Sequence, residues 1–361
     1  MVIGDLGDVF AEYSLGFDVT CHRPPSDCEV GEVSRPNVVI IGAGMAGLTA
    51  AHQLQAKCNV VVVDKGRGVG GRLATRRIGD ATLDHGAQFM TTHTAEFAGV
   101  MAQLAGAGVA TEWFHGRIGP SGAHDSDGHP RYRGVVSMNA VAKQLATGID
   151  VRTSSLVKSV VSENDVWNVH MEDGTALVAH AVISTAPVPQ TLALLENGDV
   201  ALAVEDEAAL LAVSYDPCLA LMAVLDGPSG LVEPGAVDPD DGPIDWMADN
   251  AIKGISAVPA VTIHATAEFS RANWDASNDA IAEQLLLAAD LASTAVIDSI
   301  QVQRWRYARP SVEHPERFLQ LVGLPPFVCA GDAFGGAKVE GAALSGSAAA
   351  SAVTAALGIA D

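Results

Sequence analysis

A buried strand, a glycine-rich turn and a helix follow one another after residue 36, and this succession constrains the fold more than any other feature. Residues 38–41 form a continuous β-branched run, typical of a strand covered on both faces of a parallel sheet. The turn Gly42-x-Gly44-x-x-Gly47 then opens a helix expected over residues 46–57. A second buried strand, residues 60–63, ends at Asp64. The sequence therefore predicts a βαβ unit and an α/β fold.

Each glycine of this turn has its own physical role. Gly42 permits the tight turn, Gly44 lets the backbone approach a pyrophosphate, and Gly47 lets the helix pack closely. The helix N-terminus, which includes Met45 and Ala46, offers partial positive charge to an anion. Strand, turn and helix in register predict dinucleotide binding, whereas an incidental glycine-rich turn is the alternative.

The segment that begins at Asp64 indicates which dinucleotide is bound. The Asp64 carboxylate can accept hydrogen bonds from an adenosine ribose, and residues 65–72 follow as Lys-Gly-Arg-Gly-Val-Gly-Gly-Arg. This resembles the acid-then-GGR signature of the two-dinucleotide-binding-domain flavoproteins, which include amine oxidases, phytoene desaturases and renalases. The resemblance implies noncovalently bound FAD, with an arginine offsetting the pyrophosphate charge. The cofactor-binding residues implied here are Lys65, Arg67, Gly71 and Arg72.

A third segment, residues 84–89 (Asp-His-Gly-Ala-Gln-Phe), resembles the DHGAQ sequence of renalase-like proteins. In that family it lies against the isoalloxazine ring. The resemblance therefore implies flavin contacts from His85, Gly86, Ala87 and Gln88, and ordinary surface side chains are the alternative.

Residues 329–336 (Cys-Ala-Gly-Asp-Ala-Phe-Gly-Gly) resemble the C-terminal GD motif of FAD oxidoreductases. In those proteins the aspartate hydrogen-bonds the ribitol, and the next helix directs its N-terminus at the pyrimidine edge of the flavin. The distance of this motif from the first predicts a discontinuous FAD domain. The residues implied are Gly331, Asp332, Val339, Glu340, Gly341 and Ala342, together with Val157 on an adenine-side strand.

Together the motifs resemble the bacterial renalase-like branch of the flavin amine oxidase superfamily over residues 37–357. The resemblance implies a Rossmann-type FAD domain, like that of p-hydroxybenzoate hydroxylase, and a smaller mixed-sheet α+β substrate domain. Residues 1–36 are expected to be a partly disordered extension. The FAD domain is expected over residues 37–96, 134–190 and 300–361, and the substrate domain over 97–133 and 191–299. One departure is the ribose acid, Asp64, which replaces the commoner glutamate.

Charge and cysteine content narrow the partners. The chain has 43 acidic and 21 basic residues, a net charge of −22, which argues against nucleic acid or an anionic membrane. Five cysteines without a CxxC pair favour a reducing cytoplasm. No segment is apolar enough to span a bilayer. Since the histidines near residue 120 lack a recognised ligand spacing, we expect no metal.

The substrate pocket is less constrained by the sequence. The favoured pocket residues are Gln88, Trp246, His264 and Tyr307. Further candidate walls are Phe89, Trp274 and Trp305, and further polar candidates are Asn250 and Arg306.

If the resemblance extends to activity, the small-molecule substrate is a dihydronicotinamide, an isomer of NAD(P)H. Its hydride passes to flavin N5, and O2 reoxidises the flavin with formation of H2O2. Oxidation of a small amine, which an acidic surface would attract, is one alternative. A flavin-binding or sensing protein without turnover is another.

Overall fold

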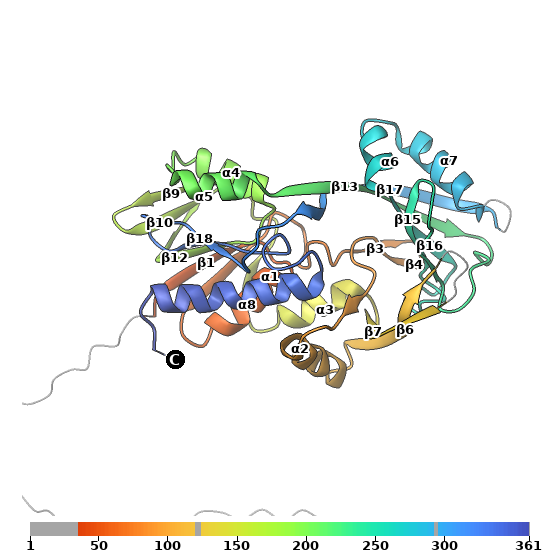
Figure 1. Ribbon diagram of the computed structural model, residues 1–361, viewed down its shortest axis with the longest axis horizontal. Coiled ribbons are helices and arrows are strands. Elements are labelled where there is room, and N and C mark those ends of the chain that lie inside the picture. Colours follow the sequence, from red (N-terminus) through yellow and green to blue (C-terminus); the bar gives the residue numbers. More distant parts are fainter. Residues whose placement is uncertain (1–34, 120–123, 292–294, 361) are drawn as a thin grey trace, which may run out of the picture. The chain divides into compact units, whose positions relative to one another are not determined.

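The structure, a computed structural model, describes residues 35–119, 124–291 and 295–360, so residues 1–34 of the expected extension lie outside it. A six-stranded sheet in the order β18-β19-β12-β1-β2-β8 carries the glycine-rich turn (Figure 1). All neighbours pair in parallel except β18, which is an antiparallel edge strand. The strands are β1 (Asn37–Ile41), β2 (Asn59–Val63), β8 (Asp150–Arg152), β12 (Ala181–Ser184), β18 (Leu319–Gln320) and β19 (Phe327–Cys329).

Side chains alternate between the two faces of β1, so each face has its own core. Val38 and Ile40 pack with four helices on one face, whereas Val39 and Ile41 pack with a small antiparallel sheet and two helices on the other. The first face is covered by α1 (Met45–Leu54), α2 (Ala95–Gly106), α3 (Met138–Leu145) and α8 (Val339–Ala356). The second is covered by β9 (Val157–Glu163), β10 (Val166–Met171), β11 (Ala176–Ala179), α4 (Val188–Glu196) and α5 (Val204–Leu211).

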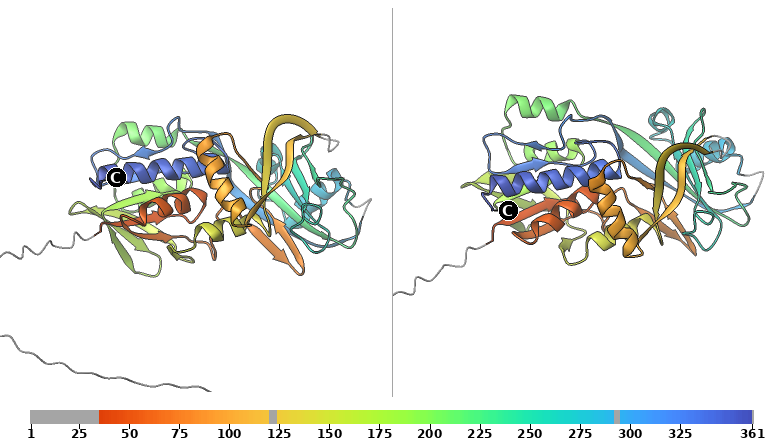
Figure 2. Two further views of the ribbon diagram at one scale, coloured as in Figure 1. Left: turned by 90° about the horizontal axis from the view of Figure 1, so that it is seen from below. Right: turned by 60° about the horizontal axis from the view of Figure 1, so that its bottom comes forward.

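Helices α1 and α8 lie side by side in every view (Figures 1 and 2). A Cβ on Gly346 would lie 2.1 Å from the carbonyl oxygen of Ala46, so only glycine allows this approach. The contact brings the N-terminal glycine turn and the C-terminal helix together although they are far apart in sequence.

A five-stranded antiparallel sheet in the order β14-β15-β16-β13-β17 forms the second part of the structure. One face carries Leu219, Leu221 and Val261 and packs on α6 and α7. The opposite face carries Met222 and Ala260 and packs on the β3–β4 hairpin. The elements are β3 (Thr75–Ile78), β4 (Ala81–Asp84), β13 (Ser214–Leu225), β14 (Ala236–Val237), β15 (Ile244–Asp249), β16 (Ala260–Ala265), α6 (Ala267–Ala272), α7 (Asn278–Ala288) and β17 (Ile297–Val312).

A three-stranded sheet, β5-β7-β6, occupies much of residues 90–134. Its strands are β5 (Met90–Thr91), β6 (Ala110–Ile118) and β7 (His124–Gly134). In Figure 1 the β6–β7 hairpin lies near the five-stranded sheet.

The predicted fold class is confirmed: a parallel sheet with a βαβ glycine turn is joined to a second, antiparallel sheet with helices. The expected domain division differs from the structure in several places. Helices α2 and α5, expected in the substrate domain, pack on the parallel sheet, and the β3–β4 hairpin, expected in the FAD domain, packs on the five-stranded sheet. Residues 300–312 belong to β17, whose long register with β13 places them in the five-stranded sheet and not with the FAD domain. Among the described residues, none of the helices combines the length and apolar character that a membrane crossing requires.

Candidate active site

The glycine turn has the geometry that dinucleotide binding requires. Gly42 has φ +109°, and a Cβ there would lie 2.4 Å from the Thr185 hydroxyl. A Cβ on Gly47 would lie 2.0 Å from the Gly42 carbonyl oxygen. At Gly44, by contrast, the nearest atom to such a Cβ is the Gly70 carbonyl oxygen at 4.0 Å. Gly42 and Gly47 are therefore required by packing, whereas Gly44 leaves an open face toward the Gly70-Gly71 turn.

Asp64 links the two glycine-rich segments. Its Oδ2 accepts from the backbone N–H of Ala43 at 2.7 Å, and its Oδ1 accepts from that of Gly66 at 2.6 Å. The short aspartate side chain thus holds the turn and the following loop in place. Each carboxylate oxygen retains acceptor capacity for a second donor.

Arg72 joins the GGR segment to the GD motif. Its guanidinium donates two hydrogen bonds to the carboxylate of Asp332, both 2.5 Å long. The same group donates to the backbone carbonyls of Tyr307 and Ala308 at 3.4 and 3.2 Å. The ion pair is partly shielded from solvent, and its bidentate geometry fixes both side chains.

The segment at residues 84–89 lies between the GGR loop and the five-stranded sheet. A Cβ on Gly86 would lie 2.0 Å from the Arg72 carbonyl oxygen, so glycine is needed for this approach. On the other side, Trp305 Nε1 donates to the carbonyl of His85 at 2.8 Å, and Thr262 Oγ1 donates to that of Asp84 at 2.9 Å. The segment is therefore held by both parts of the structure.

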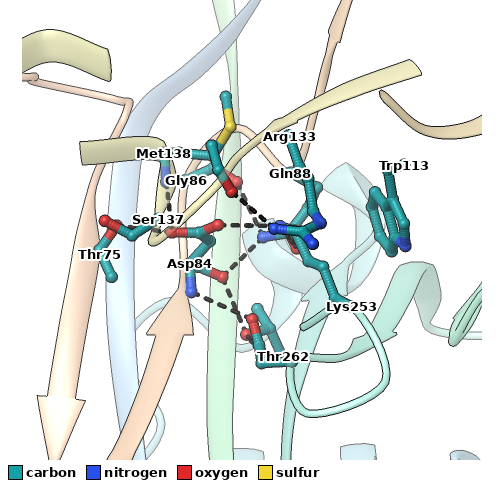
Figure 3. A network of polar contacts seen from close by, with 12 residues as sticks. Thr75, Asp84, Gly86, Gln88, Trp113, Arg133, Ser137, Met138, Lys253 and Thr262 are labelled. Atoms are coloured by element: carbon teal, nitrogen blue, oxygen red, sulfur yellow. Dashed lines mark hydrogen bonds and ion pairs between the residues drawn. The ribbon is translucent and has the colours of Figure 1, made fainter. Parts of the chain in front are cut away.

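A buried ion pair lies at the centre of this contact (Figure 3). Lys253 Nζ lies 2.9 Å from Asp84 Oδ2, and neither side chain is exposed to solvent. Asp84 Oδ1 accepts from Thr75 Oγ1 at 2.6 Å and from the Met138 backbone at 3.0 Å. Burial lowers the pKa of Lys253, and the charge of Asp84 opposes that shift. The pair connects the loop after β15 to β4 and to the start of α3.

Gln88, a favoured pocket residue, belongs to the hydrogen-bond network around the Asp84–Lys253 pair. Its Nε2 donates to the carbonyls of Asp84 and Gly86 at 2.7 and 3.2 Å, and its Oε1 lies 3.4 Å from Lys253 Nζ. Its side chain is buried. Gln88 therefore shapes the segment that carries it.

Four aromatic side chains gather beside the segment. Phe89 lies 5.3 Å from Trp246 and 6.0 Å from Phe114 between ring centroids, and Trp113 lies 4.9 Å from Phe114. We call Phe89, Trp113, Phe114 and Trp246 the aromatic cluster. Two of its predicted members, Phe89 and Trp246, come together as expected, and β6 supplies the other two.

Three ring nitrogens near this cluster are buried without a hydrogen-bond partner: His85 Nδ1, Trp246 Nε1 and His264 Nε2. Trp246 and His264 are directly opposite one another on β15 and β16. His85 stacks on Trp305 with centroids 5.5 Å apart.

Both histidines are neutral at pH 7. Burial, with a smaller effect of Arg76, lowers the pKa of His85 to about 4. Burial also lowers the pKa of His264 to about 4, against a hydrogen bond to the His85 backbone. Each ring therefore offers one N–H donor and one acceptor nitrogen.

The other candidate residues lie in several places. Tyr307 contacts Tyr215 at 5.4 Å between ring centroids, beside the Arg72–Asp332 pair and apart from the aromatic cluster. Trp274 packs in the core beneath α6 and α7, where the Arg306 guanidinium lies 4.9 Å from its ring centroid. Tyr307 and Trp274 therefore do not belong to the aromatic cluster.

The side chains of four predicted cofactor-binding residues contact other protein groups, are exposed to solvent, or are buried in a strand. The Glu340 carboxylate accepts from the backbone N–H groups of His93 and Thr94, just before α2. Lys65 Nζ donates to Gln190 Oε1 at 3.0 Å. Arg67 is exposed, and Val157 is buried in β9.

These residues fit a flavin dinucleotide. The open face of Gly44 opposite the Gly70-Gly71 turn can take a pyrophosphate at the start of α1. The unpartnered nitrogens near residues 84–89 can meet the polar edge of a ring system. When bound, FAD supplies the hydride acceptor and transfers electrons onward.

Two family profiles match the sequence. The profile of the flavin-containing amine oxidoreductases matches residues 115–354, and that of the NAD(P)-binding Rossmann-like domains matches residues 40–104. The glycine turn, residues 42–47, lies within the second of these matches.

Solved structures share the fold. A protein described as a protoporphyrinogen oxidase from Exiguobacterium sp. 255-15 is 12% identical, with a TM-score of 0.69 over 90% of this chain and 99% of its own. A wild-type putrescine oxidase bound to putrescine is 17% identical, with a TM-score of 0.69 over 89% and 99% of the two chains. At these identities the likeness concerns the fold.

Proposed function

Since the chain belongs to the flavin-containing amine oxidoreductase family and is a FAD-dependent oxidoreductase, we propose that it oxidises a dihydronicotinamide, an isomer of NAD(P)H, and reduces O2 to H2O2. This is the activity implied by its resemblance to the renalase-like proteins. The oxidation removes one hydride from the dihydropyridine ring and leaves an aromatic NAD(P)+.

The observation that carries this proposal is the lack of a poised base among the described residues of the aromatic cluster and the segment beside it. His85 and His264 have pKa values of about 4, and Asp84 is engaged by Lys253. A general base works best with a pKa near the operating pH. A donor driven by aromatisation needs no base, whereas an ammonium substrate must first lose a proton.

The chain's own residues would bind and orient such a donor. The rings of the aromatic cluster provide flat apolar surface, and the Trp246 N–H provides a donor for a carboxamide oxygen. Burial of these groups excludes water from the site, which strengthens each hydrogen bond.

Oxidation of a small amine is the second candidate. The family match and the fold shared with putrescine oxidase favour it, as does the net charge of −22, which attracts cations. In that reaction the neutral amine would lose hydride, and water would hydrolyse the resulting imine to an aldehyde and ammonia.

Product analysis separates the candidates. The holoenzyme is mixed in air with α-NADH, β-NADH or an amine, and O2 uptake, H2O2, NAD+, aldehyde and ammonia are measured. We expect one NAD+ and one H2O2 for each O2, with no ammonia. Aldehyde and ammonia would instead establish the amine reaction, and no turnover with any donor would favour a flavin-binding or sensing role.

A variant tests the missing base. We expect His264→Gln to change kcat/KM by less than about tenfold, because loss of a general base usually costs about 10²–10⁴-fold. His52→Gln, at an exposed histidine on α1, is the matched control. A loss for His264→Gln within that larger range, without one for the control, would contradict the base-free reaction.

A further inference from the structure

We propose that the aromatic cluster binds the reducing substrate and selects neutral or anionic planar molecules over cationic amines, because protein cations already lie on its rings. The inference rests on the proposed function, since it places the donor of that reaction at the cluster. It adds a substrate class, defined by charge and by hydrogen-bond acceptors, that the reaction alone does not specify.

Two rings of the cluster carry a cation. Lys253 Nζ lies 4.9 Å from the centroid of Trp113, and Arg131 Cζ lies 5.6 Å from the centroid of Phe89. The negative face of an aromatic ring attracts a cation within about 6 Å. Here the protein supplies that cation itself. Because these two ring faces already carry a protein cation, a ligand ammonium cannot make the same contact with them.

The carboxylates that contact this region already have donors. Asp84 pairs with Lys253, and Asp127 pairs with Arg131 at 2.5 Å. Asp249, two residues after Met247, accepts from the Ser229 hydroxyl and from two backbone N–H groups. Among these carboxylates none is left to serve as the counter-ion of a bound ammonium.

One more carboxylate lies on β15, next to Trp246 in sequence. Asp245 is about half exposed and lies 3.8 Å from Arg309. Its charge is therefore partly balanced and screened by water. Asp245 can attract cations to the surface, but it does not provide a buried partner for them.

The unpartnered nitrogens indicate which functional groups a ligand of the aromatic cluster needs. Trp246 Nε1 can only donate a hydrogen bond, and it is buried without an acceptor. His85, only 4% exposed, also has a ring nitrogen without a partner. A carboxamide or carboxylate oxygen on a flat ring satisfies the Trp246 donor, whereas an ammonium offers no acceptor. A buried donor without a partner is unfavourable, so the matching ligand is preferred.

Three benzene derivatives of different charge test this selection: benzamide, benzoate and benzylamine. Each is titrated into the oxidised holoenzyme, and its Kd is taken from the change in flavin absorbance. We expect benzamide and benzoate to bind at least about tenfold more tightly than benzylamine, a difference of one decade in Kd. Benzylamine binding as tightly as benzamide, or more tightly, would overturn the inference.

A tryptophan variant identifies the donor. Trp246→Phe keeps a ring but removes the N–H, so we expect benzamide and benzoate affinity to fall about fivefold, with benzylamine unchanged, as one hydrogen bond is lost. Trp274→Phe makes the same change in the α6–α7 core and should leave all three values as they are. Equal effects of Trp246→Phe on all three probes would contradict the assigned role of Nε1.

A second variant removes the cation without leaving a buried charge. The double change Asp84→Asn, Lys253→Met should bring the affinities for benzylamine and benzamide closer together than in the wild type. An unchanged ratio in a folded, flavin-containing variant would contradict the role of Lys253.

The inference and the proposed function fail separately. If benzamide and benzoate are preferred but no dihydronicotinamide reduces the flavin, the charge selection stands and the proposed donor is wrong. If a dihydronicotinamide reduces the flavin while benzylamine binds as tightly as benzamide, the proposed donor stands and the charge selection is wrong.

Discussion

Lys253 lies after β15 and Asp84 ends β4, yet the Lys253 ammonium contacts the Asp84 carboxylate at 2.9 Å with both side chains fully buried. The pair ties the five-stranded sheet to the segment at residues 84–89. A buried ion pair contributes little net stability, but removal of one partner leaves an uncompensated charge.

We therefore expect Lys253→Met to lower the free energy of unfolding by about 3–5 kcal/mol, as for other buried pairs that lose one partner. The double variant with Asp84→Asn should lose less, because neither remaining side chain is charged. Urea unfolding measures both. Arg152→Met, which breaks an exposed pair with Asp150, is the control and should cost about 0–1 kcal/mol. If Lys253→Met were as mild as this control, the pair would not be a buried one.

Two glycines of the first turn should respond differently to alanine. A Cβ on Gly47 meets the Gly42 carbonyl oxygen at 2.0 Å, so Gly47→Ala should lower the unfolding free energy by about 1–3 kcal/mol or more. A Cβ on Gly44 meets nothing closer than 4.0 Å, so Gly44→Ala should leave the flavin-free protein as stable as the wild type.

The same Gly44→Ala change should nevertheless weaken FAD binding by about tenfold or more, because the methyl group occupies the space of the pyrophosphate. FAD titration of the flavin-free protein, followed by fluorescence, gives the Kd. Wild-type affinity in Gly44→Ala would mean that the dinucleotide lies elsewhere.

Arg72→Lys tests the link between the two cofactor motifs. A lysine cannot hold Asp332 in two parallel hydrogen bonds while it also donates to the carbonyls of Tyr307 and Ala308. We expect a loss of about 1–3 kcal/mol in the free energy of FAD binding, the usual range for hydrogen bonds to charged groups. Arg152→Lys, at an exposed pair, should bind FAD like the wild type. Equal affinities for the two variants would argue against a role of the Arg72–Asp332 pair.

The low pKa of His85 predicts how stability depends on pH. The pKa of His85 falls from 6.5 to about 4 on folding. Between these two pH values the ring is protonated in the unfolded chain and neutral in the folded chain. The contribution of this buried neutral ring is present above pH 6.5 and is lost as the pH falls toward 4, on the order of 3 kcal/mol in total.

His85→Gln should therefore lose less stability than the wild type between about pH 7.5 and about pH 4.5 in urea unfolding. His52→Gln, at an exposed histidine, should follow the wild type throughout. Parallel curves for wild type and His85→Gln would show that His85 does not titrate in this way.

The sequence was most informative where the structure depends on neighbouring residues. The strand at residues 38–41, the glycine turn and the helix after it are recognisable because β-branched residues, glycines and the helix follow directly in the chain, and the structure bounds them within a few residues. The antiparallel pairs that β10 forms with β9 and with β11 are also local, and the Asp173-Gly174 turn lies between β10 and β11.

Elements that depend on distant partners were not predicted. Strand β7 has the sequence HDSDGHPRYRG, which has the composition of a loop, and it becomes a strand by pairing with β6. Strand β3 (TRRI) is polar, and its Arg76 donates hydrogen bonds to Gln301 and Gln303 of β17. Tertiary pairing thus outweighs local preference at both places.

The candidate site shows the same limit. The residues of the motifs were found, but Lys253 and Trp113 were missed. The partner of Lys253, Asp84, is 169 residues away, so the sequence does not indicate the ion pair. A lone lysine in an otherwise apolar stretch, residues 251–255, was the one available signal. Trp274 was counted among the pocket walls because sequence alone does not distinguish the two faces of the five-stranded sheet.

That this flavoenzyme takes hydride from a dihydronicotinamide is tested most directly by anaerobic stopped-flow absorbance of the bound flavin. The holoenzyme is mixed in turn with α-NADH, β-NADH and a panel of primary and secondary amines. The proposed chemistry predicts rapid bleaching by a dihydronicotinamide, at a rate that does not rise with the ionisation of a base between about pH 6 and about pH 8. Bleaching by an amine, with none by any dihydronicotinamide, would contradict it.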